Sequence, residues 1–554
     1  MTWDRAGRIA ATTVAAILPL GFLAIFFALP VAGMLARGFA PGGVLDLGGF
    51  AEVLSRARTQ RIIGFTLAIS AAATVISVVV GVPVAHALYR LALPGRRTLR
   101  AIVAMPFVLP TVVVGVMFRS LLAEGGALGV LGLDGEWGGI LAAFVFFNLA
   151  VVVRTVGAAW EGLDRRPEEA AATLGAGPAT VFRTVTLPAL APSIISAASI
   201  VFLFCATAFG VVLTMGGLAY GTVETEIYLL TTALFDLRGA AVLSVVQLVA
   251  VVAMLLLADR ARSRDAGTQR AAKSAIAPGR VTAYAMGSVI ATVLAVAFVA
   301  VPVLALVVRS LRRQGEWTLD YYLALGRVGG ADGRSALPVT VWEALGTSWR
   351  IAIDATILAV VLGLLVAVLV SRPARSPGGL RWRRLLDGVV MLPLGVSAVT
   401  VGFGFLITLD RPPLDLRTSP VLIPIAQAIV ALPLVVRTLA PVLRAIDDRQ
   451  RQVAATLGAR PWQVLATVDL PIIWRPLLAA VGLALAVSLG EFGATSFLAR
   501  PDSPTLPVVI YRLIGRPGVD NLGMALAASV ILAVVTVTVM GVVERLRVSS
   551  VGAF

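Results

Sequence analysis

Two copies of one short polar segment decide the fold. The first copy reads EEAAATLGAGP at 168–178 and continues to VTLP at 185–188. The second reads RQVAATLGARP at 451–461 and continues to VDLP at 468–471. Each is an Ala-rich helical stretch that Gly and then Pro interrupt, and glycine ends helices while proline breaks them. Each copy is therefore predicted to form an L-shaped elbow, two short helices joined at a glycine, outside the bilayer.

The composition indicates a polytopic membrane protein. Of the 554 residues, 58% are hydrophobic and 14% are charged, and the mean hydropathy is +0.94. A soluble domain is far less apolar than this. The net charge of +16 is carried almost wholly by arginines between the apolar stretches. Cytoplasmic loops and anionic lipid headgroups explain this charge better than nucleic acid does, so a lipid bilayer is the expected partner and nucleic acid is not.

The counts of rare residues argue against several kinds of chemistry. The chain has one Cys and one His, so a disulfide framework and a His/Cys metal site are not expected. The single lysine, Lys273, lies in AAKS and not in the Gly-Lys-Ser/Thr of a nucleotide-binding loop. We therefore expect no enzymatic site, cofactor or metal. If ATP drives this protein, another polypeptide hydrolyses it.

Apolar stretches predict twelve membrane spans and hence an all-α fold. An even count places both termini on one side of the membrane. The predicted spans are 11–36, 62–89, 101–121, 138–159, 190–215, 238–258, 282–308, 348–371, 385–408, 421–443, 475–498 and 522–543.

Arginine distribution gives the orientation. Arginines are frequent in the loops near 90–100, 165–166, 260–270 and 372–384, whereas the loop at 122–137 has acidic residues and no arginine. The positive-inside rule therefore predicts that both termini and both elbows are cytoplasmic. Two groups of arginines depart from the rule, because they fall on the predicted outer face: Arg56, Arg58 and Arg61, and Arg309, Arg312 and Arg313.

The repeat extends well beyond the elbows. Residues 64–90 align without gaps to 346–372, and Phe209-Gly210 matches Phe492-Gly493. The chain thus divides into a first repeat at 1–258, a cytoplasmic linker at 259–281 and a second repeat at 282–554. Because each half has six predicted spans, the two halves are parallel repeats, and the path should lie between them.

Two polar residues within apolar stretches are candidates for a translocation path. A carboxylate at Glu491 costs several kcal/mol in a bilayer unless it faces a water-filled path or a cation. Glu491 could contact a transported cation, or it could pair with Arg437 or Arg154. Asn148 could line the path or could bind a neighbouring helix.

Acidic residues also follow the fifth predicted span. Glu224, Glu226 and Asp236 are expected to be solvated charges of an outer loop, with contact to a docking protein as the alternative.

The paired elbows resemble the EAA loops of ABC importer permeases, the coupling helices that sit in a groove of the ATPase subunit. In that family an acidic residue of the motif contacts the ATPase, and Glu168 or Glu169 fits that position. The second copy departs from the pattern, because Arg451 and Gln452 replace the acids. Either the two docking sites are unequal or the second binds by shape alone. The coupling residues implied by the resemblance are Glu168, Glu169, Ala171, Ala172, Leu174, Gly175, Ala454, Ala455, Leu457 and Gly458.

The resemblance covers nearly the whole chain and is to the fused-dimer, type I permeases of the thiamine and iron(III) branch. The stretches at 488–493, 505–511 and 146–148 look most like thiamine permeases, with iron(III) as the alternative cargo. The resemblance implies a multi-pass protein of the bacterial plasma (inner) membrane that works by alternating access. Its expected partners are two copies of an ABC ATPase subunit, which bind the ATP, and an extracytoplasmic substrate-binding protein.

Two other classes of protein fit less well. An ion-coupled secondary transporter also uses repeated six-helix halves, but it gives no reason for Ala-rich Gly-Pro elbows at equivalent positions. A membrane enzyme would require a cluster of His, Cys or acidic residues at the bilayer face.

Overall fold

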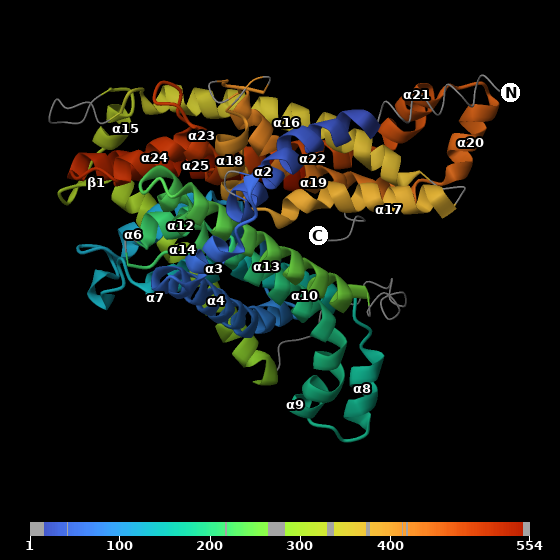
Figure 1. The fold of residues 1–554 in the computed structure, drawn as a ribbon. Helices are drawn as coiled ribbons and strands as arrows, with labels where there is room; N and C mark the ends of the chain where they lie inside the picture. Colours follow the sequence, from blue (N-terminus) through green and yellow to red (C-terminus); the bar gives the residue numbers. More distant parts are fainter. Residues whose placement is uncertain are drawn as a thin grey trace.

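The computed structural model describes residues 16–40, 43–216, 219–263, 283–328, 337–372, 377–410, 412, 414–416 and 419–546. Within these ranges the protein is all-α apart from a two-stranded antiparallel hairpin of β1 (Arg312–Arg313) and β2 (Glu316–Trp317). The predicted fold class, an all-α polytopic membrane protein built from two repeats, is confirmed. Figure 1 shows the first half, from blue to green, lying against the second half, from yellow to red.

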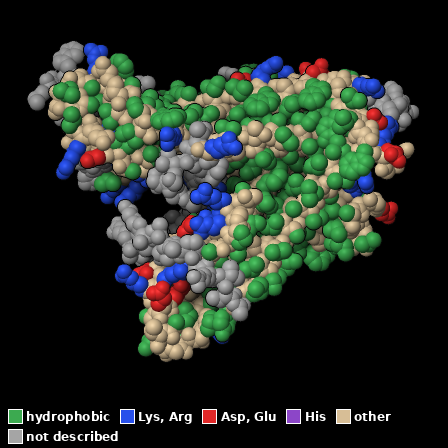
Figure 2. Space-filling view, turned by 180° about the vertical axis from the view of Figure 1, so that it is seen from behind, with side chains coloured by type: hydrophobic (Ala, Val, Ile, Leu, Met, Phe, Trp, Pro, Cys, Tyr) green, Lys and Arg blue, Asp and Glu red, His purple; other side chains and the backbone are tan. Residues whose placement is uncertain are grey.

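Ten of the described helices are long and apolar enough to cross a membrane. Exposed apolar side chains such as Val79 and Ile357 lie along them, as expected for helices that face lipid, and Figure 2 shows a broad apolar surface. The ten spans are Ala16–Phe39, Ala57–Arg90, Trp137–Glu161, Pro178–Ala206, Leu237–Met254, Met286–Ser310, Val341–Ser371, Leu422–Ala445, Trp462–Gly490 and Val519–Val543.

The third predicted span of each half is broken, which is why ten helices are found where twelve were expected. In the first half, α5 (Arg96–Ala104) and the 3-10 turn η3 (Met105–Val108) meet α6 (Thr111–Leu122) at a bend of 103°. In the second half, α17 (Pro377–Met391) and η8 (Leu392–Gly395) precede α18 (Ala398–Thr408). Proline lacks the N–H that continues a helix, and Pro106, Pro110 and Pro393 lie at these breaks.

The predicted fifth spans, 190–215 and 475–498, are also not continuous. The helix α10 (Leu187–Ala206) is followed by α11 (Gly210–Met215), and α22 (Leu470–Gly490) by α23 (Gly493–Leu498). A Cβ atom on Gly210 would lie 2.4 Å from Thr111 Oγ1, and one on Gly493 would lie 3.0 Å from Ala398 Cβ. Glycine therefore lets each break pack directly against the start of α6 or α18.

The first described helix of each half also packs against the other half. The helix α2 (Leu29–Phe39) packs on α18 of the second half, where a Cβ atom on Gly404 would lie 2.9 Å from Pro30 Cβ. The helix α14 (Met286–Ser310) packs on the first half, and its Phe298 ring lies 6.4 Å from that of Phe118. Each of these helices therefore lies between the two halves, because α2 also packs on α13 (Leu237–Ser263) and α14 also packs on α25 (Val519–Leu546) of their own halves.

The remaining elements connect or extend these spans. The first span contains the π-helical turn η1 (Ala24–Ala28), and the predicted linker begins within α13, so that only its part up to residue 263 is described. The other bounds are α3 (Leu47–Ser55), α4 (Ala57–Arg90), η4 (Gly129–Leu131), α7 (Trp137–Glu161), α12 (Val223–Thr232), α13 (Leu237–Ser263), η7 (Ala283–Ala285), α15 (Asp320–Ala324), α16 (Val341–Ser371), α19 (Leu422–Ala445), α24 (Leu506–Ile514) and α25 (Val519–Leu546).

Candidate functional site

The first elbow has two short helices joined at a glycine. It consists of α8 (Arg166–Thr173), α9 (Pro178–Val181) and the π-helical turn η5 (Phe182–Thr186), which leads into α10. Gly175 has a φ of +88°, a left-handed conformation that glycine adopts without strain. The N–H groups of Gly175 and Ala176 donate to the carbonyls of Ala172 and Ala171 over 3.0 and 3.1 Å. These two bonds close the end of α8 and turn the chain toward α9.

The second elbow repeats this backbone. Its elements are α20 (Asp448–Thr456), α21 (Pro461–Val464) and η9 (Leu465–Asp469), followed by α22. Gly458 has a φ of +87° and donates to Ala455 over 3.1 Å, while Ala459 donates to Ala454 over 3.0 Å. In Figure 1 both elbows project from the same end of the helix bundle.

The free faces of the two elbows differ. Leu174 in the first elbow is 88% exposed and Leu457 in the second is 83% exposed. The second elbow also exposes Val453 and Trp462, at the positions where the first has Ala170 and Ala179. The alanines that the sequence singled out, Ala171, Ala172, Ala454 and Ala455, are exposed or half-buried on these faces. The second face is therefore more apolar.

The two acids of the first elbow point to different environments. Glu169 is exposed, whereas Glu168 is half-buried and faces the protein. Arg90, the last residue of α4, donates to the Glu168 carboxylate over 2.6 Å, and the Thr186 hydroxyl donates to it over 2.8 Å. Of the two acids expected to meet an ATPase, only Glu169 is free to do so in this conformation.

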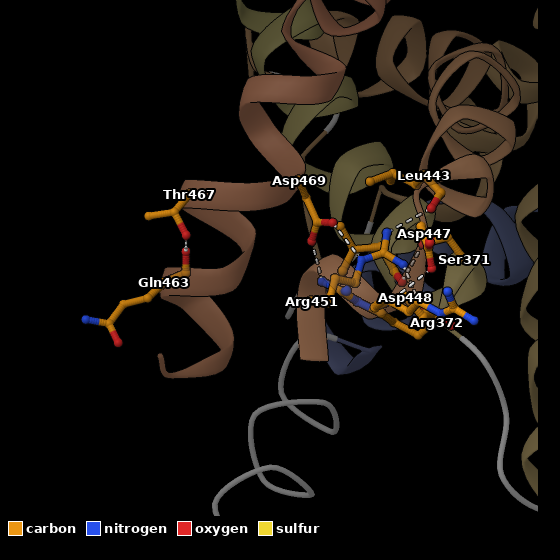
Figure 3. Close-up of polar contacts among 11 residues, drawn as sticks. Ser371, Arg372, Leu443, Asp447, Asp448, Arg451, Gln463, Thr467 and Asp469 are labelled. Carbon is orange, nitrogen blue, oxygen red and sulfur yellow. Dashed lines mark hydrogen bonds and ion pairs between the residues drawn. The ribbon is translucent and has the colours of Figure 1, made fainter. Parts of the chain in front are cut away.

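The second elbow makes the equivalent connection with different residues (Figure 3). Arg372, which follows α16, donates to the fully buried Asp469 over 2.5 Å, and Arg451 donates to the other oxygen of that carboxylate over 2.8 Å. Arg451 also donates to Asp448 over 2.7 Å and to the Leu443 carbonyl over 2.8 Å. Burial by itself would lower the pKa of Arg451, but its bonds to Asp469 and Asp448 raise that pKa above the ordinary value.

Sequence reasoning noted Arg451 as a departure and missed Asp469. The repeat held the signal, because Asp469 occupies the position of Thr186 just as Arg451 occupies that of Glu168.

Glu491 lies at the break between α22 and α23 and is 7% exposed. Its carboxylate accepts the N–H groups of Ala494 and Thr495 over 2.7 and 3.1 Å, and it also accepts the Thr495 hydroxyl. The carboxylate therefore satisfies backbone groups at the start of α23. Its place on a translocation path stays a prediction.

Asn148 lies in α7 of the first half and is 2% exposed. Its amide nitrogen donates to the Phe144 carbonyl over 2.9 Å and to Cys205 Sγ over 3.3 Å. These contacts join α7 to α10, which favours the helix-packing alternative for Asn148.

Aromatic rings fill the interface between the halves at the two fifth-span breaks. The rings of Phe209 and Phe492 stack across this interface, with centroids 5.4 Å apart and planes at 25°. Tyr228 packs against Phe209 at 5.4 Å and against Phe497 of the other half at 5.2 Å. Phe209 and Phe492 are both buried. The halves therefore meet tightly here, whereas Figure 2 shows an indentation between their elbow-bearing lobes.

Glu224 is a buried interface residue that sequence reasoning placed wrongly. It is fully buried in α12, accepts the Ser397 hydroxyl of the second half over 2.9 Å and also accepts the Gln247 amide. Glu226 is buried too and is paired with Arg58 at 2.6 Å. For these two acids the expectation of solvated loop charges fails, because both lie in the first turn of α12, whose apolar neighbours pack into the core; Asp236 is part-exposed and pairs with Arg56 over 2.8 Å. The burial of Glu224 and Glu226 also argues against contact with a docking protein.

Comparison with known proteins agrees with this architecture. The family model described as "Binding-protein-dependent transport system inner membrane component" matches the chain twice, at 77–263 and 359–547. The chain is 30% identical to the thiamine transport system permease protein ThiP of Brucella abortus (strain 2308), over 95% of this chain and 96% of that protein. It is also 30% identical to ThiP of Escherichia coli (strain K12), over 79% and 81% of the two chains.

Two further matches cover about half of the chain. The putative 2-aminoethylphosphonate transport system permease protein PhnV of Salmonella typhimurium is 28% identical over 47% of this chain and 94% of that protein. A chain of a bacterial alginate ABC transporter, solved with an alginate-bound periplasmic protein, matches with a TM-score of 0.40 and 16% identity, over 49% of this chain and 99% of that chain. The double family match over two helical repeats identifies the chain as a member of the binding-protein-dependent transport system inner membrane component family, and within it as a fused, duplicated ABC importer permease.

Proposed function

We propose that this permease forms the path by which thiamine, delivered by an external binding protein, crosses the bacterial inner membrane. One observation carries the choice of cargo. The thiamine permease of Brucella abortus aligns with nearly the whole chain, including both repeats, at 30% identity.

The path in this proposal lies between the halves. The Phe209–Phe492 stack closes it at the fifth-span breaks. Glu491 lies next to this stack in the chain, and Glu224 bridges the halves through Ser397. Thiamine is a cation, and a buried carboxylate is the group that compensates a cation within a membrane.

The elbows are the coupling sites in this proposal, with one ATPase subunit docked on each. Exposed Leu174 and Leu457 support it, because an exposed apolar side chain on a rigid elbow can enter a groove of a partner. The same proposal places the elbows and both termini in the cytoplasm and the binding protein on the opposite face. ATP binding shifts the alternating-access equilibrium only as far as its affinities for the two states differ.

The test is uptake into proteoliposomes that contain this chain, its ATPase and its binding protein. Labelled thiamine and iron(III) are compared, each with and without ATP and with an imposed ion gradient. ATP-dependent uptake of thiamine alone supports the proposal. Uptake of iron(III) alone would leave the proposed architecture unchanged and replace thiamine by iron(III) as the cargo. Uptake that follows the ion gradient and ignores ATP would contradict the proposed mechanism.

A further inference from the structure

Each elbow is tied to the end of a long membrane helix through a carboxylate that faces the protein, but the carboxylate comes from different positions in the two halves. In the first half it is Glu168 on the first elbow helix, bound by Arg90 and Thr186. In the second half it is Asp469 at the end of the elbow, bound by Arg372 and Arg451. We propose that these two clusters, here called the elbow clamps, set the orientation of the elbows, and that Glu168 is a positioning residue and not a docking contact.

The clamps join equivalent parts of the backbone. The alignment of the repeats pairs Arg90 with Arg372, so the cation at the end of the membrane helix is retained. It contacts the elbow in both halves, at 2.6 Å in the first and 2.5 Å in the second. The Arg90 side chain is 7% exposed and that of Asp469 is fully buried. An ion pair that is shielded from water loses little to screening, and removal of one partner leaves an uncompensated charge.

The charges of the second clamp are rearranged as a set. Asp448 and Arg451 occupy the positions of Arg165 and Glu168, so both signs are reversed. Reversal alone would place Arg451 beside Arg372 with no anion between them. Asp469, at the position of Thr186, supplies that anion and contacts both arginines. Three positions thus differ between the halves, while the ion pair between the membrane helix and the elbow is present in both. This is expected if the ion pair itself is the required feature.

This arrangement explains why the second elbow has no acid at the position of Glu168. If the acid served mainly to bind an ATPase, its loss from the second elbow would weaken the docking site there. An acid that positions the elbow can move to another position in the clamp without consequence for docking. The inference rests on the proposed coupling function for its transport readout, but the positioning itself can be measured without an ATPase.

The experiment moves one clamp into the other half. Glu168→Arg places two arginines together, and we expect ATP-dependent uptake to fall by roughly tenfold or more, because a buried charge loses its partner. Arg165→Asp/Glu168→Arg/Thr186→Asp rebuilds the second-half clamp in the first half and should return uptake to within about threefold of the original. The reciprocal Asp448→Arg/Arg451→Glu/Asp469→Thr rebuilds the first-half clamp in the second. Arg183→Glu, an exposed charge reversal in the same elbow, is the control.

A spin label measures elbow orientation in the isolated chain. Thr173 is exposed at the end of α8, and a label on Thr173→Cys is selective because the native Cys205 is buried. The label should become more mobile in Glu168→Arg and regain its original spectrum in the triple variant. Glu168→Gln and Thr186→Val, which add no charge, should give intermediate mobility and serve if Glu168→Arg is poorly folded.

Two outcomes would overturn the clamp. One is a Glu168→Arg variant whose label mobility and uptake equal those of Arg183→Glu. The other is a folded triple variant whose label remains mobile. Failure of the proposed function looks different: the unmodified chain would show no ATP-dependent uptake, while label mobility would still follow the clamp residues.

Discussion

The two elbows have the same backbone and different surfaces. Both turn at a glycine with φ near +88°, and both close with the same pair of hydrogen bonds. Yet the first exposes an acid, Glu169, and one large apolar side chain, whereas the second exposes three, Val453, Leu457 and Trp462. The repeat has kept the shape of the elbow and let its free face diverge. We therefore expect two docking sites of equal geometry and unequal chemistry.

The largest effect should come from the shared shape. Gly175→Trp and Gly458→Trp each force a bulky residue into the left-handed region, at a cost of about 1–3 kcal/mol that distorting the elbow relieves. Each should abolish ATP-dependent uptake while expression and membrane insertion stay normal. Gly177→Ala is the matched control, because Gly177 has an ordinary φ of −68° and open space around it. Normal transport in either Trp variant would remove the coupling role from that elbow.

The next effect should separate the two surfaces. Leu174→Glu removes the one large apolar contact of the first elbow, worth about 2 kcal/mol when buried, so ATPase docking should weaken roughly 30-fold. Leu457→Glu should weaken docking only about fivefold, because two apolar neighbours remain. Docking is measured as ATPase affinity for chains in which the opposite elbow carries its Trp variant.

Val130→Glu, at a 96% exposed position in the predicted outer loop, is the control for a new surface charge. Equal losses for Leu174→Glu and Leu457→Glu would show that the two surfaces are functionally alike.

A substitution at the second fifth-span break should change cargo uptake without changing ATPase docking. Glu491 has Ala208 as its counterpart, so only the second fifth-span break carries this carboxylate, and the proposed path would have it on one side only. Glu491→Gln should lower thiamine uptake about tenfold, because a contact with a charged group contributes about 1.5–3 kcal/mol. ATPase docking should be unchanged. Unaltered uptake would leave Glu491 with a structural role at the start of α23.

The smallest effect should come from exchanging one aromatic residue between the elbows. Trp462→Ala should weaken ATPase docking on the second elbow only about threefold, because Val453 and Leu457 remain exposed on the same face. Ala179→Trp should strengthen docking on the first elbow if the two grooves are alike. A loss in both variants would mean that the same ATPase groove accepts a large ring on the second elbow and not on the first.

Sequence reasoning found the features that local rules control. Gly175 and Gly458 have chemistry that fixes a turn, and long apolar stretches fix a membrane span, so the fold class and the repeat could be predicted. The breaks at Phe209 and Phe492 could not be predicted, because a continuous helix and a broken one show the same apolar periodicity. A break is tolerated where the freed backbone groups find partners, as they do at the Glu491 carboxylate. Burial of Glu224 and the role of Asp469 depend on contacts between segments far apart in the chain.

The packing of α2 and α14 between the halves joins the two repeats independently of the covalent linker. The helix α14 packs on α4 and α6 of the first half as well as on α25 of its own half, and α2 packs on α18 of the second half as well as on α13 of its own half, so the two repeats contact each other at two separate places. If the chain were cleaved between the repeats, the packing of α2 and α14 would still hold the two polypeptides together. Fusion then mainly fixes the stoichiometry. Every first repeat is made with one second repeat, so the two unlike elbows always occur once each in the same transporter.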